Sequence, residues 1–261
     1  MIDIHTHILP GLDDGAGNME QALRLIRDAA AGGTGGIILT PHCAPSYGFF
    51  NYDGERLDRQ FQILCREVYE KARIPVRLYP GMEVLYEGRE EMLRHRDGYF
   101  PLCGSRYLLL EYYFDADARE FLEGIETAGE CGFVPVIAHP ERYECVQEDP
   151  KLAAAGRRRG ALFQVNKGSL AGRHGARALA AGEKLLELDE ADFIASDAHH
   201  PVMRGSSLAN VSAYVRARFG EERAWRLFEE NPRRILMDLP VRGRRGRTGD
   251  DLKQQKKKTG E

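Results

Sequence analysis

The sequence lacks the features of a secreted, disulfide-stabilised or membrane-spanning protein. Its five cysteines include no CxxC pair and stand at irregular spacing, which suits free thiols in a reducing cytosol better than a disulfide framework. No segment reaches the roughly 18 apolar residues of a membrane span. The N-terminus has neither the basic stretch nor the apolar run of a signal peptide. We therefore expect a cytoplasmic protein.

Two signatures of enzymes that handle phosphate are also missing. No cysteine is followed six positions later by an arginine, so the sequence excludes a phosphatase mechanism based on a cysteine thiolate. No glycine-rich P-loop is present, which excludes a nucleotide-driven kinase of that type. Any chemistry on phosphate would therefore need other residues.

Positive charge is concentrated at one end of the chain. The formal net charge is −3, yet residues 241–261 alone carry +5, so the remaining residues carry −8. An acidic body argues against nucleic acid as the main partner. We expect one folded domain over residues 1–240 and a disordered tail over 241–261. The tail is either a solvated terminus or a contact for anionic lipid or an acidic partner, so membrane association is expected to be peripheral at most.

Short apolar runs alternate with amphipathic segments along the chain. Apolar runs of four or five residues suit strands covered on both faces, and their alternation with helices is typical of βα units in a parallel sheet. Seven such units without a glycine-rich phosphate fingerprint favour a closed α/β barrel over a doubly wound sheet. Strands are expected over Ile2–Ile4, Gly36–Thr40, Pro75–Tyr79, Tyr107–Leu110, Val134–Ala138, Leu162–Val165 and Phe193–Ala195. Helices are expected over Met19–Ala31, Glu55–Ala72, Asp117–Cys131, Pro150–Arg159, Arg173–Leu188, Ser207–Phe219 and Glu221–Glu229.

The first strand runs directly into His5 and His7. Alternate side chains of an extended chain face the same side, so both imidazoles project together and could hold a divalent transition metal. Taken alone, such a pair could equally be two surface histidines.

The other expected strands also end at polar residues. Catalytic groups of parallel barrels gather at the carboxyl ends of the strands, so we expect these side chains to share one rim. Five histidines and several carboxylates are too many for one ion, and two or three ions are expected. A mixed set without thiolates favours Mn²⁺, Fe²⁺ or Zn²⁺ over a structural zinc. The residues at these later strand ends are His42, Glu83, Glu111, His139, Asn166, Asp197 and His199.

Two metal ions about 3.5–4 Å apart can share a bridging hydroxide and stabilise the entering and leaving oxygens of a displacement at phosphorus. Such a pair needs a bridging carboxylate, which Glu83 or Glu111 could supply. Asp13 and Asp14 lie on the loop after the first strand. One of them could ligate a third ion or protonate a leaving oxygen, although Asp-Gly is also ordinary turn chemistry.

Two arginines follow the predicted ligands closely. Arg142 stands three residues after His139, and Arg204 stands five residues after His199. Arginine can form bidentate hydrogen bonds with phosphate oxygens, so both are candidates for binding a phosphate group. The alternative for each is a surface salt bridge.

An ordered set of motifs covers most of the chain. IDIHTH, LDDG, TPH, PGME, LLLEY, IAHPERY, QVN, ASDAHH and NPRRIL follow one another in sequence. Together they resemble the polymerase-and-histidinol-phosphatase (PHP) superfamily. Within it, they resemble the manganese-dependent protein tyrosine phosphatases of bacterial capsule and exopolysaccharide operons. The resemblance runs from residue 1 to about residue 240.

This resemblance implies a distorted seven-stranded (β/α)7 barrel of the PHP type. It implies hydrolysis of phosphotyrosine on the tail of the tyrosine kinase that regulates capsule or exopolysaccharide synthesis. Mn²⁺ is the expected metal, with Fe²⁺, Co²⁺, Zn²⁺ or Mg²⁺ as alternatives. Other readings are a histidinol-phosphate phosphatase on the same metal cluster, a nuclease or carbon–nitrogen hydrolase, and a regulatory module that keeps metals for structure. Assembly into a homo-oligomer stays open.

The resemblance also implies which residues act together. Arg142 and Arg204 would hold the phosphate. Arg204 is followed by Gly205, where the family often has proline. The choice between Asp13 and Asp14 as the site residue stays open. The implied ligand groups are His5, His7, Glu111 and Asp197 for one ion, Glu83, Glu111 and His139 for a second, and His42, His199 and Asp14 for a third.

Overall fold

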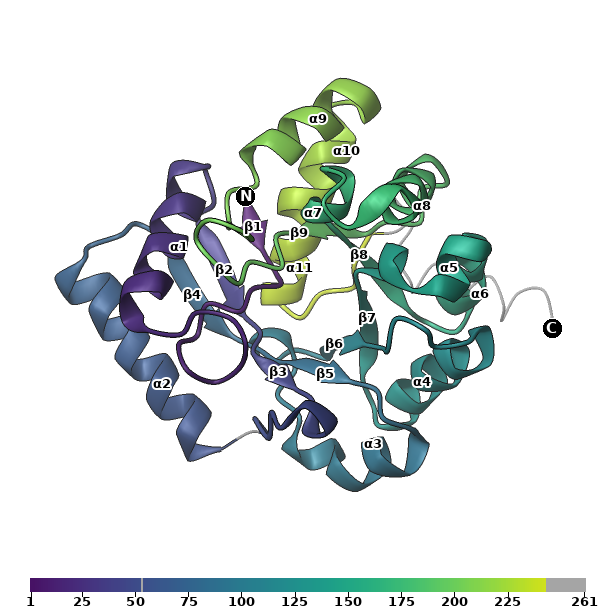
Figure 1. Cartoon of the computed structure of the whole chain (residues 1–261), viewed down its shortest axis with the longest axis horizontal. Helices are drawn as coiled ribbons and strands as arrows, with labels where there is room; N and C mark the ends of the chain where they lie inside the picture. The colour runs from purple at the N-terminus through teal and green to yellow at the C-terminus, as the bar shows by residue number, and fades with distance from the viewer. Residues whose placement is uncertain (53, 243–261) are drawn as a thin grey trace.

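Figure 1 shows short strands at the centre of the molecule and helices around them. The structure is a computed structural model that describes residues 1–52 and 54–242. The strands are β1 Ile2–Asp3, β2 Gly36–Leu39, β3 His42–Cys43, β4 Arg77–Pro80, β5 Glu83–Leu85, β6 Tyr107–Glu111, β7 Val134–Ala138, β8 Leu162–Asn166 and β9 Phe193–Ala195. The α-helices are α1 Met19–Ala31, α2 Glu55–Arg66, α3 Arg89–His95, α4 Ala118–Glu130, α5 Glu144–Glu148, α6 Leu152–Arg158, α7 Lys167–Leu170, α8 Gly175–Glu187, α9 Ala209–Phe219, α10 Glu221–Trp225 and α11 Asn231–Leu236.

In the part of the chain that the structure describes, all paired strands run parallel, in two sheets with the orders β1-β2-β4 and β3-β5-β6-β7-β8-β9. β3 continues the path of β2, and β5 continues that of β4, so the same chain segments run from one sheet into the other. A parallel bridge between Thr6 and Ala198 joins the continuations of β1 and β9. There the amide of His7 donates to the carbonyl of Ala198 over 2.9 Å. The strand paths therefore close into a distorted α/β barrel, as the sequence predicts.

Two short interruptions separate β2 from β3 and β4 from β5. Pro41 stands in the first, where the missing N–H removes a donor from the ladder. Gly81 stands in the second, and a Cβ atom there would lie 2.8 Å from Cγ2 of Ile38. The chain can pass this close only with glycine. Both interruptions come immediately before the part of the barrel that carries His42 and Glu83.

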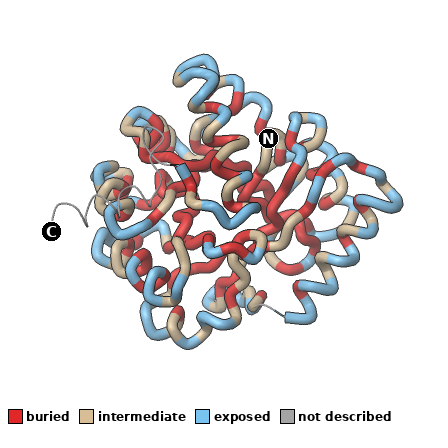
Figure 2. The backbone as a smooth tube through the Cα atoms, turned by 180° about the vertical axis from the view of Figure 1, so that it is seen from behind, coloured by how far each residue is buried: buried red, intermediate tan, exposed pale blue. Residues whose placement is uncertain are grey.

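Alternation along the strands divides the core into two layers. Ile38, Leu109, Val136 and Phe193 belong to one buried cluster, which Ile235 of α11 helps to close. The strand residues between them belong to a larger cluster shared with the helices. This period of two matches a barrel with one side chain facing inward and the next facing the helices. Figure 2 shows that the strands are buried inside the molecule and that exposed residues lie on the helices around them.

The predicted helices are mostly present, with differences at their ends and among the shortest. The segment predicted as Glu55–Ala72 is α-helical only to Arg66 and continues as a π-helical turn, Glu67–Lys71. The segment predicted as Glu221–Glu229 changes in the same way after Trp225. Four short helices were not predicted because each buries only a few residues and shows no helical period. They are α3, α5, α7 and α11.

The beginning of the predicted tail packs on the barrel. Val241 is buried, and its amide donates to the hydroxyl of Tyr107 over 3.2 Å. The amide of Arg242 donates to Oδ1 of Asn231. The rest of the predicted 241–261 segment lies outside the described residues, so its disorder and the boundary at residue 240 stay predictions. Within the described ranges, no helix combines the length and apolar character needed to cross a bilayer.

Helix α4 offers a matched test of the packing between helix and sheet. A Cβ atom at Gly124 would lie 2.5 Å from the hydroxyl oxygen of Tyr112, whose ring is buried. We expect Gly124→Ala to lower the free energy of unfolding by about 1–3 kcal/mol, because overpacking outweighs the better helix propensity of alanine. A Cβ atom at Gly129, on the same helix, would have no described atom within 4 Å apart from its chain neighbours and the backbone of the helix itself. Gly129→Ala should stabilise the protein by about 0.5–1 kcal/mol. Urea unfolding of both variants measures this, and equal stabilities would contradict it.

Candidate metal centre

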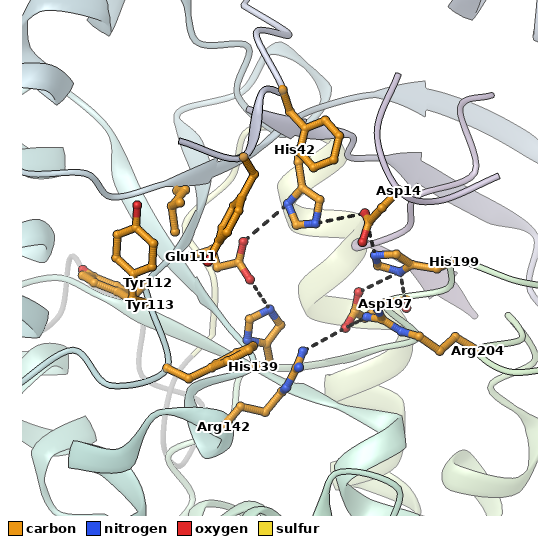
Figure 3. A pocket seen from close by; sticks show the side chains of 14 residues that line it. Asp14, His42, Glu111, Tyr112, Tyr113, His139, Arg142, Asp197, His199 and Arg204 are labelled. Atoms are coloured by element: carbon orange, nitrogen blue, oxygen red, sulfur yellow. Dashed lines mark hydrogen bonds and ion pairs between the residues drawn. The ribbon is translucent and has the colours of Figure 1, made fainter. Parts of the chain in front are cut away.

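The polar residues at the strand ends converge on one pocket of about 390 Å³ (Figure 3). His5 and His7 follow β1, His42 and Glu83 open β3 and β5, and Glu111 ends β6. His139 follows β7, Asp197 and His199 follow β9, and Asp14 lies on the loop before α1. The structure thus brings together every residue that the sequence suggests as a metal ligand. The lining residues from this set are Asp14, His42, Glu111, His139, Asp197 and His199.

Glu83 lies at the centre of this cluster and is fully buried. Its Oε2 atom lies 3.1 Å from Nε2 of His5, Nε2 of His7 and Nδ1 of His42. Its Oε1 atom lies 3.2 Å from Nε2 of His139. Neither carboxylate oxygen has a hydrogen-bond partner of good geometry. A buried carboxylate without hydrogen bonds is costly unless a cation neutralises it, so the donor set fits a metal ion.

Among residues 1–52 and 54–242, three groups of donor atoms are close enough to hold ions, each with its atoms within 4.8 Å of one another. Their composition differs from the grouping that the resemblance implies, because Glu83 rather than Glu111 lies with His5 and His7. Glu111 lies instead 3.4 Å from both His42 and His139. The assignment of individual ligands to individual ions stays a prediction. The groups are His7, Asp14, His42 and His199; His5, His7 and Glu83; and His42, Glu83 and Glu111.

The two neighbouring aspartates have different positions. Oδ2 of Asp13, whose side chain is fully buried, accepts hydrogen bonds from Nδ1 of His7 over 2.7 Å and from the amide of His42 over 3.0 Å. Asp14 is 57% exposed, and its Oδ1 lies 3.4 Å from Nε2 of His199. Asp13 therefore orients His7 and leaves Nε2 of that ring free for an ion, whereas Asp14 itself faces the pocket.

Gln164 plays the corresponding part for His5, and sequence reasoning did not single it out. Its Oε1 accepts a hydrogen bond from Nδ1 of His5 over 2.7 Å. Gln164 stands two positions before Asn166 on β8, so both side chains face the same side of the strand. That spacing was the available signal. Asn166 donates from Nδ2 to Oδ2 of Asp197 over 2.6 Å and so holds that carboxylate in place.

Mutual attraction between imidazoles and carboxylates dominates the electrostatics. Burial alone would raise the pKa of Glu83, but His5, His42 and His139 hold it well below its usual range. Burial would lower the pKa of His139, yet Glu111 and Glu83 raise it to about 9. The Glu83 carboxylate is thus anionic at neutral pH, and a cation that binds here displaces a proton from the His139 ring.

Two residues of the site hold an unusual backbone conformation. His139 and Asp197 have φ angles of +31° and +51°. Positive φ disfavours residues with a Cβ atom and costs about 1–3 kcal/mol, so it persists where the surroundings over-determine it. At both positions the turn directs a polar side chain from the end of a strand into the pocket.

Both predicted arginines lie at the pocket beside the acidic cluster. Nη2 of Arg204 donates to Oδ2 of Asp197 over 2.5 Å, and Nη1 of Arg142 lies 3.6 Å from the same oxygen. The guanidinium of Arg142 also lies over the ring of Phe114, 4.3 Å from its centroid. Figure 3 shows the two arginines on either side of Asp197. A phosphate placed here would meet guanidinium groups and the candidate metal ligands together.

Comparison with known proteins finds similarity over nearly the whole chain. The model of the family "Capsular polysaccharide synthesis, CpsB/CapC" matches residues 1–237. The tyrosine-protein phosphatase YwqE of Bacillus subtilis (strain 168) is 33% identical over 229 residues, which cover 88% of this chain and 89% of YwqE. The tyrosine-protein phosphatase CpsB of Streptococcus pneumoniae is 28% identical over 250 residues, which cover 91% and 99% of the two chains.

The fold of the chain is also similar to that of a solved structure. It comes from work on YwqE of Bacillus subtilis and CpsB of Streptococcus pneumoniae, which are described as unique metal-dependent tyrosine phosphatases. It matches with a TM-score of 0.85 and 31% identity, over 95% of this chain and 99% of the other. A β-aspartyl dipeptidase from Fervidobacterium islandicum has a TM-score of 0.53 at 12% identity and shares only the fold.

The contact between Asp13 and His7 predicts a role that a variant can test. We expect Asp13→Asn to lower the affinity for Mn²⁺ about 10–100-fold, because the neutral amide no longer fixes the His7 ring with a charged acceptor. Isothermal titration calorimetry measures this. Asp115→Asn is the matched control, since it removes the same charge from an exposed residue that does not line the pocket. An equal loss of affinity in both variants would show that charge alone, and not orientation, explains the effect.

Proposed function

Because the chain belongs to the CpsB/CapC family of capsular polysaccharide synthesis, we propose that it is a metal-dependent phosphotyrosine-protein phosphatase. The observation that carries this proposal is the placement of Arg142 and Arg204 at one pocket with the cluster around Glu83. The same pocket thus offers a site for cations and a site for an anionic ester. Both serve the hydrolysis of a phosphomonoester by water that metal ions activate.

The residues that would hold the ions are the three groups of imidazole and carboxylate donors. We propose Mn²⁺ as the ion, because nitrogen and carboxylate donors without thiolates suit it. When bound, such ions act as Lewis acids on the phosphoryl oxygens and activate water for in-line attack. Asp13 and Gln164 keep Nε2 of His7 and His5 directed toward Glu83.

The arginines would position the substrate. Arg142 and Arg204 can both donate to the non-bridging oxygens of a phosphate and neutralise its charge. Asp197 holds the two guanidinium groups near one another before substrate arrives. Binding of the phosphate would then exchange contacts with this carboxylate for contacts with phosphate oxygens.

Asp14 is better suited to hold a cation than to donate a proton. Its hydrogen bond with His199 keeps the pKa of the carboxyl well below its usual range. It is therefore ionised at neutral pH. The phenol that leaves from phosphotyrosine has a solution pKa of about 10, so it departs with only modest assistance at its oxygen.

We infer that the physiological substrate is the phosphotyrosine tail of a bacterial tyrosine kinase in the capsule or exopolysaccharide pathway. The curated relatives that are named tyrosine-protein phosphatases support this inference. The protein would encounter such a kinase tail in the cytoplasm. It would come close to the membrane only through its complex with the kinase. The acidic body of the chain agrees with a substrate other than nucleic acid.

Three substrates offered in parallel test the proposed function. Purified protein with Mn²⁺ should hydrolyse a phosphotyrosine peptide and leave single-stranded DNA intact, with activity lost on chelation and restored by Mn²⁺. The measurement is release of inorganic phosphate. Rapid turnover of histidinol phosphate beside an idle phosphotyrosine peptide would replace our proposal with the histidinol-phosphate alternative.

Two substitutions separate metal binding from substrate binding. We expect Arg142→Ala to lower kcat/KM about 10²–10³-fold, because one donor to the phosphoryl group is lost, while metal content stays that of the parent protein. His7→Ala should lower metal content and activity together, because two of the candidate ion groups share that ring. Metal analysis of the purified variants checks this, and equal metal loss in both would show that the assigned roles are wrong.

A further inference from the structure

One side of the pocket is aromatic, and the metal centre leaves this side unexplained. Tyr47, Phe49, Tyr113 and Phe114 line the pocket together with the polar residues. Tyr47 is 62% exposed and Phe114 is 45% exposed. Contiguous exposed apolar side chains around a pocket mark ligand-binding surfaces. The question is which part of a substrate this wall contacts.

Tyr47 is held in place by the turn on which it stands. The amide of Ala44 donates to the carbonyl of Phe49 over 2.9 Å, and the amide of Phe49 donates back over 3.1 Å. Gly48 has a φ of +82°, which closes the turn at little steric cost. Because these hydrogen bonds already order the turn, binding of a ligand to the Tyr47 ring would not carry the entropic cost of ordering the loop.

Contacts from two other strand ends fix the same turn. The amide of Ser46 donates to Oε1 of Glu87 over 2.8 Å. The hydroxyl of Tyr113 donates to Oγ of Ser46 over 2.8 Å. The Tyr113 ring meets the Tyr47 ring edge to face, with centroids 6.0 Å apart and an angle of 62°. Tyr113 therefore supports Tyr47 through its ring and its hydroxyl.

The aromatic wall joins the two charged parts of the pocket. At one end, Phe49 stacks on His42 with centroids 5.8 Å apart and an angle of 13°. At the other end, Phe114 lies under the guanidinium of Arg142. In Figure 3 Tyr113 lies on the side of Glu111, opposite Asp14 and His199. A group bonded directly to a phosphate in this pocket would therefore lie beside aromatic rings.

The chemistry of phosphate esters then distinguishes two substrate classes. In an aryl phosphate the ring carbon is bonded to the ester oxygen, so the ring must occupy the space next to the phosphate. In a phosphoserine this space holds one methylene group, and the peptide backbone must come close to the pocket mouth. An aromatic wall gains favourable ring contacts only with the first class.

We propose that Tyr47, supported by Tyr113, is the specificity-determining residue that binds the aryl ring and selects aryl over alkyl phosphomonoesters. This inference rests on the proposed function and deepens it. Phe114 is less suitable as a test, because its ring also supports Arg142. Tyr47 contacts none of the candidate metal ligands through a hydrogen bond or ion pair among the described residues, so its substitution probes the ring contact itself.

The experiment compares two peptides of one sequence that carry phosphotyrosine or phosphoserine at the same position. Tyr47→Ala should lower kcat/KM for the phosphotyrosine peptide about 10-fold, chiefly through KM, and should lower the preference for that peptide over the phosphoserine peptide by a similar factor. Tyr47→Phe should behave like the parent protein, because it keeps the ring. Metal content and thermal unfolding of each variant establish that the centre and the fold are intact.

Phe50→Ala is the matched control. Phe50 stands on the same segment, is 67% exposed and does not line the pocket, so its removal should change neither kcat/KM nor the preference. An unchanged preference in Tyr47→Ala would overturn the inference while leaving the proposed function in place. The inference would also be overturned if Tyr47→Phe lowered the preference for the phosphotyrosine peptide as much as Tyr47→Ala does. The hydroxyl group, and not the ring, would then determine the preference. A parent protein that hydrolyses neither peptide would overturn the proposed function and this inference with it.

Discussion

The carboxylate of Glu83 is the constraint on which the site depends. Four imidazoles from His5, His7, His42 and His139 lie within 3.2 Å of its two oxygens. Such a group is unfavourable in a folded interior unless opposite charge compensates it. Protons on the imidazoles can do so, and metal ions can do so more strongly. The barrel thus holds a cluster whose stability is coupled to what it binds, and the orienting contacts of Asp13 and Gln164 limit how the rings can respond.

The fold makes this cluster possible through the interruptions in two of its strands. If the strands were paired without interruption through Thr40–Pro41 and Gly81–Met82, their side chains would alternate strictly between the inside and the outside of the barrel. The side chains at the rim could then take few other directions. The break before Glu83, which requires glycine at position 81, places the carboxylate in line with His42 of the neighbouring strand. Parallel pairing then brings Glu111 and His139 alongside. The irregular backbone at this end of the barrel therefore brings the candidate metal ligands together. The regularly alternating buried side chains in the rest of the strands stabilise the barrel.

Much of this architecture could be predicted from the sequence, because its signals are local. Four- and five-residue apolar runs indicate buried parallel strands, and polar residues at their ends indicate one rim. What could not be predicted depends on tertiary contacts. Asp13 accepts a hydrogen bond from His7, whereas Asp14 faces the pocket. The spacing of the two residues in the sequence does not predict which of them takes which position. That Glu83 lies 3.1 Å from Nε2 of His5 likewise depends on how β5 is placed beside the end of β1. Short helices such as α5 bury too few residues to leave a periodic pattern.

The polar side and the aromatic side of the pocket suit different parts of a phosphate ester. The cluster around Glu83 and the two arginines would recognise features that every phosphomonoester shares, namely negative charge and oxygen ligands. Charge recognition alone would accept phosphate on serine, on sugars or as the free anion. Discrimination must then come from groups that contact what lies beyond the ester oxygen. The groups in this pocket that would do so are the rings of Tyr47 and Tyr113, whose positions are held by hydrogen bonds that do not involve the candidate ligands. A substitution at Tyr47 would therefore change the contacts of the ester group without removing a hydrogen bond or ion pair of the candidate metal ligands.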